Sequence, residues 1–137
     1  MTTARDLMTP DTQCVSVHQT LTAAAKMMRD LDVGALPICG EDDKLAGVLT
    51  DRDIVVACVA EDINPVTVLA GDLARGKPVT IGADDSAEET LRTMARHQVR
   101  RLPVIDGHRL VGMVAQADVA RELPEDVVGA VLREVSE

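Results

Sequence analysis

The chain of 137 residues contains no phenylalanine, tyrosine or tryptophan. Its core must therefore be aliphatic, built from valine, leucine, isoleucine, alanine and methionine. The absence also excludes the aromatic platforms on which single-stranded nucleic acids stack and the aromatic cages that hold organic cations. Basic residues are few, 14 against 23 acidic ones, which gives a net charge of -9. We therefore expect neither nucleic acid nor a membrane as a partner, because both need a basic face.

The sequence also lacks long apolar runs. None approaches the roughly 18 residues of a membrane span, and the first residues do not have the basic and then apolar pattern of a secretory signal. We expect a cytoplasmic protein. The alternative is export without a recognisable signal peptide, which leaves no trace in a sequence. The length fits one domain or two very small ones.

Cysteines are scarce. Cys14, Cys39 and Cys58 show no C-x-x-C spacing, and three pairings are open. Cys58 lies in an apolar run and is predicted to be a buried small hydrophobic residue. If a disulfide forms, the preferred pair is Cys14 with Cys39, which flank the first long helix. Three free thiols are the alternative for an intracellular protein.

The chain contains an internal repeat. A shift of 66 residues aligns the two halves as far as Leu36-Pro37 and Leu102-Pro103, and a shift of 65 aligns Gly47 with Gly112 and Asp53 with Asp118. This places repeat 1 at residues 1–60, a linker at 61–69 and repeat 2 at 70–123. An amphipathic helix follows at 124–137.

Each repeat has the pattern of a β-α-β-β-α unit, which predicts an α/β fold. Strands are expected at 14–17 and 78–81, and each is followed by a helix that begins after Thr20 or Ser86. Two strands joined by a polar turn come next, and a second helix begins near Asp51 or Gln116. A unit of about 60 residues is marginal by itself, so the two copies should pack sheet against sheet.

These motifs resemble the CBS (cystathionine-β-synthase-type) domain over residues 4–123. The resemblance rests on Leu36-Pro37-Ile38, Leu102-Pro103-Val104, Asp6-Leu7-Met8 and the G-h-h-[ST]-x-x-D motif at 47–53. It implies tandem CBS repeats packed with pseudo-two-fold symmetry into one CBS pair. It also implies a homodimer that binds an adenosine-containing ligand, such as AMP, ATP, NAD or S-adenosylmethionine, and that regulates rather than catalyses.

The resemblance assigns ligand roles in repeat 1. It implies that the Thr50 hydroxyl donates to a phosphate oxygen and that the Asp53 carboxylate accepts from the ribose hydroxyls. Arg52 is a further phosphate candidate, with simple solvent exposure as its alternative. From spacing alone, the favoured interpretation of Thr50 and Asp53 is a capping box, which starts a helix whether or not a ligand binds, and the resemblance reverses this preference.

Repeat 2 departs from the motif. Asp118 is present, but Ala115 stands where Thr50 stands in repeat 1 and has no hydroxyl to offer a phosphate. We therefore expect at most one competent nucleotide site per chain, with Asp118 as the candidate that repeat 2 retains.

Two other groups complete the candidate ligand site. Arg100 and Arg101 occupy a position where the family often places a basic side chain against a phosphate; their alternative is pairing with nearby acids. Val15, Leu36 and Pro37 are candidates to contact an adenine ring, and their alternative is the hydrophobic core.

Metal and catalytic signals are weak. His18, His97 and His108 have no ligand spacing, so a zinc site of His97 with Glu122 or His108 is only a minor alternative. Cys14 and His18 lie four residues apart without an orienting acid, and no enzymatic activity is expected. The apolar stripe of the tail (Val127, Val128, Val131, Leu132 and Val135) should cover the chain's own repeats or contact a second copy.

The sequence thus predicts a regulatory module that senses an adenosine-containing ligand, requires no cofactor and acts in trans on a partner protein. The alternative is a stress-response or interaction protein that binds no nucleotide, with a disulfide or zinc site in its place.

Overall fold

The two long helices begin at the predicted caps. In the computed structural model, which describes residues 1–41, 44–74 and 76–136, α2 spans Leu21–Leu31 and α4 spans Ala87–His97. The side-chain oxygens of Thr20 and Ser86 each accept a hydrogen bond of 3.1 Å, from the N–H of Ala23 and Glu89. These bonds satisfy N–H groups that have no partner within the helix.

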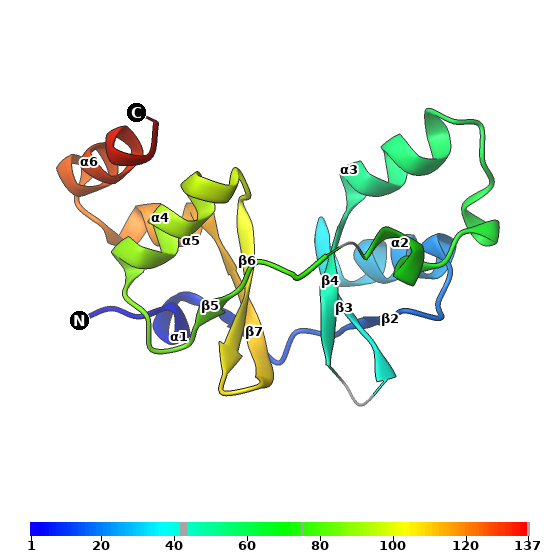
Figure 1. Cartoon of the computed structure of the whole chain (residues 1–137), viewed down its shortest axis with the longest axis horizontal. Coiled ribbons are helices and arrows are strands. Elements are labelled where there is room, and N and C mark those ends of the chain that lie inside the picture. The colour runs from blue at the N-terminus through cyan, green and yellow to red at the C-terminus, as the bar shows by residue number, and fades with distance from the viewer. Residues whose placement is uncertain (42–43, 75, 137) are drawn as a thin grey trace. The chain divides into compact units, whose positions relative to one another are not determined.

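Each repeat contributes a small sheet (Figure 1). In the first, β2 (Val15–Ser16), β3 (Ala35–Cys39) and β4 (Leu45–Thr50) lie in the order β2-β3-β4. In the second, the order is β1-β7-β6-β5, formed by β1 (Thr9–Pro10), β7 (Arg109–Ala115), β6 (Arg101–Asp106) and β5 (Ile81–Gly82). In both, the hairpin is antiparallel and the first strand of the repeat pairs parallel to it. The β-α-β-β-α order is confirmed in both repeats.

Two strand predictions were wrong in extent. The strand expected at 14–17 consists of Val15 and Ser16 only, and the one expected at 78–81 begins at Ile81. Pro78 has no N–H to donate to a ladder, and both strands pair with a neighbour over two residues only. Part of the predicted turn at 40–43 (Asp42 and Asp43) lies outside the described residues.

The remaining elements are helical. α1 spans Ala4–Leu7, and α3 (Asp51–Ile54) continues directly into a π-helical turn, η2 (Val55–Val59). The 3₁₀ turns η3 (Pro65–Thr67) and η4 (Ala70–Leu73) follow. The second repeat ends with α5 (Gln116–Glu122), and α6 (Glu125–Ser136) follows it.

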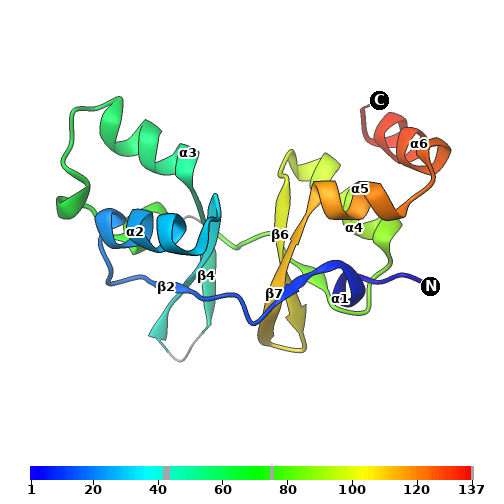
Figure 2. The same ribbon diagram turned by 180° about the vertical axis from the view of Figure 1, so that it is seen from behind.

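The compact units are not the contiguous sequence repeats. One unit comprises Met1–Thr12 with Val79–Glu137, and the other comprises Gln13–Pro78. The opening segment of the chain therefore folds with the second repeat, where α1 lies beside β7 and β1 pairs with it (Figure 2). The segment between the repeats folds with the first.

This exchange is reciprocal. Thr3 forms a β-bridge with Ser86, and the residue 66 positions later, Leu69, forms one with Thr20. Likewise, the N–H of Ala4 donates to Asp85 at 2.9 Å, while the N–H of Ala70 donates to Gln19 at 2.8 Å. The segment that precedes each repeat's first strand thus pairs beside the helix cap of the other repeat.

Both cores are aliphatic, as the composition predicted. In the unit of Gln13–Pro78, the largest fully buried side chains are Val15, Leu21, Leu36, Ile38 and Leu49. In the other unit they include Leu91, Met94, Leu102, Val104 and Val114. Burial of these residues supplies the main stabilising free energy of each unit.

The tail helix packs on its own chain. Val131 is buried in the core of its unit, and Val127 and Val128 pack against the same core. α6 lies on α4, where Arg92 forms ion pairs with Glu89 and Glu134 at 2.7 and 3.2 Å. Hydrogen bonds to these carboxylates raise the pKa of Arg92. The side chain of Val135, the last residue of the predicted stripe, lies outside the described part of the chain.

None of the helices that the structure describes combines the length and the apolar character needed to cross a bilayer.

Candidate functional site

Thr50 and Asp53 form a reciprocal capping box at the junction of β4 and α3. The Thr50 side-chain oxygen accepts from the N–H of Asp53 at 3.1 Å, and the carboxylate of Asp53 accepts from the N–H of Thr50 at 2.8 Å. The N–H of Asp51 donates to the Gly34 carbonyl at 3.0 Å, which ties the start of α3 to the chain just before β3. The structure therefore holds both side chains in a defined orientation.

The capping bonds leave chemistry available to a ligand. Thr50 uses its oxygen as an acceptor in the box, so its hydroxyl proton is still able to donate. Asp53 uses one carboxylate oxygen, Oδ2, for the box, and a carboxylate has a second oxygen that accepts hydrogen bonds. The capping and ligand interpretations of this motif are thus compatible with each other.

The matching junction in the second repeat is built differently. Ala115 precedes α5 and makes no side-chain cap. Asp118 pairs instead with Arg121, at 2.6 Å. The hydroxyl is absent and the retained carboxylate already has a cationic partner within its own helix.

The basic candidates divide between the two units. Arg52 belongs to the same unit as Thr50, whereas Arg100 and Arg101 belong to the other. All three are exposed, and among the described residues none of the three has an ion pair. The carbonyl of Arg100 accepts from the N–H of Gln116 at 2.8 Å, the counterpart of the bond between Gly34 and Asp51.

The apolar candidates for an adenine contact are buried in the sheet. Val15 and Leu36 have no exposed surface and belong to the core of their unit. Pro37 is buried in β3 opposite Val48. For Val15 and Leu36 this geometry favours the core over a ligand contact.

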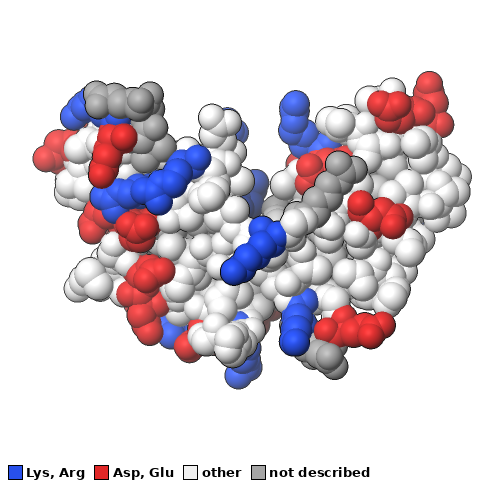
Figure 3. All heavy atoms as spheres, in the orientation of Figure 1, with Lys and Arg blue, Asp and Glu red and all other residues white. Residues whose placement is uncertain are grey.

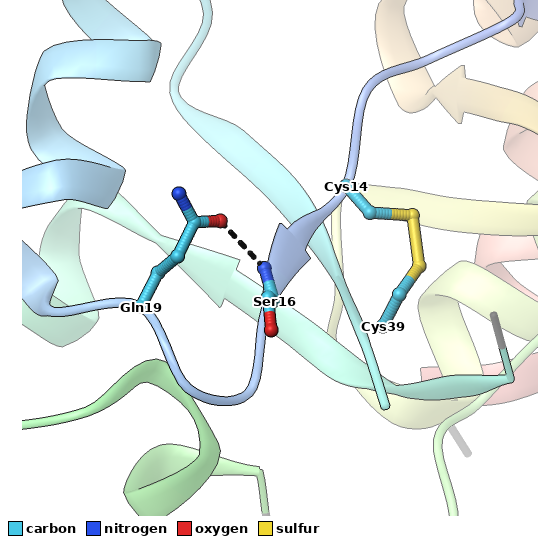
Figure 4. The surroundings of a disulfide bond; sticks show 4 residues. All are labelled: Cys14, Ser16, Gln19 and Cys39. Atoms are coloured by element: carbon cyan, nitrogen blue, oxygen red, sulfur yellow. Dashed lines mark hydrogen bonds between the residues drawn. A yellow bond between two sulfur atoms is a disulfide. The ribbon is translucent and has the colours of Figure 1, made fainter. Parts of the chain in front are cut away.

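A disulfide joins Cys14 to Cys39, the pair preferred from the sequence (Figure 4). It lies beside the parallel pairing of β2 with β3, where Ser16 is opposite Cys39. The N–H of Ser16 donates to the Gln19 side chain at 2.8 Å, which orders the turn that leads to α2. Cys58 is buried, as predicted, and its thiol is free.

The weak zinc candidates lie at the ends of two neighbouring helices. His97 ends α4 and Glu122 ends α5. Within the described ranges, no group of three or more histidine, cysteine, aspartate or glutamate side chains is placed to hold a metal ion. A site there would need ligands beyond this pair.

The family is decided by a direct match. The CBS domain model matches residues 4–60 and again residues 70–125. The chain belongs to the CBS domain family. Its two repeats are the two matched CBS domains, and the G-h-h-[ST]-x-x-D motif at 47–53 is intact only in the first.

Two comparisons place the chain near one mycobacterial protein. It is 56% identical over 128 residues to hypoxic response protein 1 of Mycobacterium tuberculosis, which covers 93% of this chain and 90% of the relative. A crystal structure of hypoxic response protein I with two coordinated zinc ions superposes with a TM-score of 0.81. Its sequence is 55% identical, and the match covers 90% of this chain and all of that one.

A more distant relative shows the same fold with a nucleotide. The crystal structure of CBSX2 in complex with AMP has a TM-score of 0.74 at 24% identity, over 88% of this chain and 95% of that chain.

The exposure of the apolar segment 54–59 was not predicted from the sequence. The run is apolar throughout, yet Val55, Val56 and Val59 are 52%, 51% and 71% exposed. The signal was available in the repeat, because the residues 65 positions later include Ala120 and Arg121. The exposed Arg121 at the position of Val56 indicates that this face of the helix is not part of the core in the second copy.

Proposed function

We propose that this CBS pair is a regulatory module that binds an adenosine-containing ligand, of which AMP is the first candidate. The observation that carries the proposal is the Thr50–Asp53 capping box, which presents a hydroxyl and a carboxylate at a strand-to-helix junction. The AMP complex of CBSX2 supports this choice of ligand class. Thr50 would donate to the phosphate and Asp53 would accept from the ribose hydroxyls.

The output would act in trans and without catalysis. A ligand that binds one arrangement of the protein more tightly than another shifts the population toward it, and a partner protein would respond to that arrangement. The relationship to hypoxic response protein 1 supports a role under stress, such as limiting oxygen. A cytoplasmic homodimer is part of this proposal.

Calorimetric titration with AMP tests the proposal, provided that the variants keep the helix cap. In Thr50→Asp, the new side chain is itself a good N-cap residue but places a negative charge where the phosphate would lie. We expect AMP affinity to fall by more than about tenfold, since a lost charge-assisted contact is worth about 1.5–3 kcal/mol. Thr50→Ser, which keeps both the cap and the hydroxyl, should bind like the native protein.

Thr20→Asp is the matched control, because the Thr20 side-chain oxygen likewise accepts a capping hydrogen bond, at the start of α2 in the same unit, and has no assigned ligand role. It should leave AMP affinity unchanged. Equal affinity in Thr50→Asp and the native protein would contradict the assignment of the phosphate to Thr50. Absence of binding to AMP, ATP, NAD and S-adenosylmethionine at millimolar concentration would favour the interaction protein that binds no nucleotide.

A further inference from the structure

A stretch without acidic residues runs through the second domain. Residues 90–105 contain four arginines and a histidine but no aspartate or glutamate, in a chain that has 23 acidic residues. Arg96, Arg100 and Arg101 are exposed, and none of the three forms an ion pair with another described residue. We call these three residues the arginine cluster.

The first domain lacks this charge at the equivalent place. Residues 24–39 carry no net charge, because their two basic residues are balanced by two acidic ones, and Asp30 stands at the position of Arg96. Both stretches form the same helix, turn and strand. The fold itself therefore does not account for the arginines.

The backbone that carries the arginine cluster is held in place. α4 ends at Gln98, which has a left-handed φ of 56°, and the N–H of Val99 donates to the Met94 carbonyl at 2.9 Å. Just beyond this turn, the carbonyl of Arg100 accepts from the N–H of Gln116 at 2.8 Å. An ordered backbone lowers the entropy cost of a contact with a partner.

A carboxylate from another helix already binds the arginine that precedes the cluster. Arg92 lies four residues before Arg96, so the two are neighbours on one side of α4. The Nε of Arg92 donates to Glu134 of α6 at 3.2 Å, and its Nη1 donates to Glu89 at 2.7 Å. The chain's own tail helix thus supplies an acid to Arg92, whereas among the described side chains none pairs with Arg96.

The charge of the whole chain indicates the kind of partner. The net charge is -9, and acidic side chains lie over both units on the face drawn in Figure 3. A long polyanion, such as a nucleic acid or an anionic bilayer, would meet these acids as well as the arginine cluster. A short acidic segment of a protein would meet the cluster alone. Guanidinium groups bind carboxylates through two parallel hydrogen bonds, and arginine is enriched where proteins bind one another.

We infer that the arginine cluster binds an acidic segment of a partner protein, whose carboxylates pair with Arg96 as Glu134 pairs with Arg92. The surface belongs to the second domain, and the inference does not depend on nucleotide binding. Arg100 and Arg101 are also the sequence candidates for a ligand phosphate, whereas Arg96 has no such role. Substitution of Arg96 therefore separates the two functions.

Fluorescence anisotropy with a labelled octaglutamate peptide, in the absence of nucleotide, tests the surface. At about 50 mM salt, where exposed charges are weakly screened, the native chain should bind the peptide with a dissociation constant below about 1 mM. Arg96→Glu should raise this constant about three- to thirtyfold, because the reversal removes an attraction and adds a repulsion of similar size. Circular dichroism should show that the variant is folded.

Lys26→Glu is the matched control, because it changes the net charge by the same amount on the equivalent helix of the first domain. It should leave the dissociation constant of the peptide unchanged. Equal losses in the two variants would show that only the net charge matters and would overturn the inference.

Other anions are the competing outcome of the same measurement. A single-stranded DNA octanucleotide and vesicles that contain phosphatidylserine should both bind more weakly than the octaglutamate peptide. Tighter binding of either, or no binding of the peptide at millimolar concentration, would overturn the inference.

An AMP titration of Arg96→Glu keeps this inference distinct from the nucleotide proposal. The variant should bind AMP like the native chain, and a parallel loss of AMP affinity would overturn the assignment of Arg96 to a separate surface. A native chain that binds the peptide but not AMP would support this inference and contradict the nucleotide proposal.

Discussion

At the scale of single residues, the duplication allows the same position to be compared in the two repeats. Thr50 caps a helix and still has a hydroxyl proton to donate, whereas Ala115 at the same place in the second repeat does neither. A hydroxyl, unlike an apolar side chain, can combine a structural and a ligand role because it is donor and acceptor together.

Gly112 and its counterpart Gly47 should respond differently to the same substitution. A Cβ on Gly112 would lie 2.8 Å from the Met8 sulfur and would collide with the Thr9 carbonyl, whereas a Cβ on Gly47 would meet Ala74 at 3.4 Å. Gly112→Ala should therefore lower the free energy of unfolding by about 1–3 kcal/mol, because β1 must move. Urea denaturation measures this.

Gly47→Ala is the control and should lose less than about 1 kcal/mol, since an ordinary contact replaces empty space. Equal losses in the two variants would show that β1 is not pressed against Gly112 as described.

At the scale of elements, local signals predicted the long helices well and the short strands poorly. Thr20 and Ser86 predict where α2 and α4 begin, because a helix cap and helical periodicity are both patterns of residues that are close in sequence. β1, of only two residues, exists because Thr9 and Pro10 meet Met113 and Gly112, about a hundred positions later. A pairing that distant leaves no local pattern to read.

The same limit applies to the candidate site. The motif at 47–53 pointed to Thr50 and Asp53 because it is contiguous, and the structure joins the two in one capping box. Whether Val15 faces a ligand or the core depends on packing that a sequence does not display, and the structure buries it.

The disulfide covalently links the two sides of the two-residue pairing of β2 with β3. Cys14 and Cys39 are 25 residues apart, and closing a loop of that length stabilises a protein by about 3.5 kcal/mol in the chain-entropy account. A reductant should therefore lower the urea midpoint of the native protein. The double variant Cys14→Ser with Cys39→Ser should show no such dependence, and three titratable thiols in the unreduced, denatured protein would contradict the pairing.

At the scale of the whole molecule, the two CBS domains have diverged in complementary ways. The first domain keeps the intact motif, and Val55, Val56 and Val59 on its last helix are exposed. The second domain has Ala115 in place of the threonine, and its helix α4 is packed against α6. Each compact unit thus includes the segment that precedes the other repeat. Our proposal therefore assigns nucleotide binding to the first repeat.

The most direct test of the central claim, that the first repeat binds an adenosine ligand, is an AMP titration followed by amide NMR on isotopically labelled protein. The account predicts saturable shifts of the Thr50 and Asp53 N–H signals, whose hydrogen bonds form the capping box, with much smaller shifts at Ala115 and Asp118. No shifts at millimolar AMP, or shifts centred on the second repeat, would contradict it.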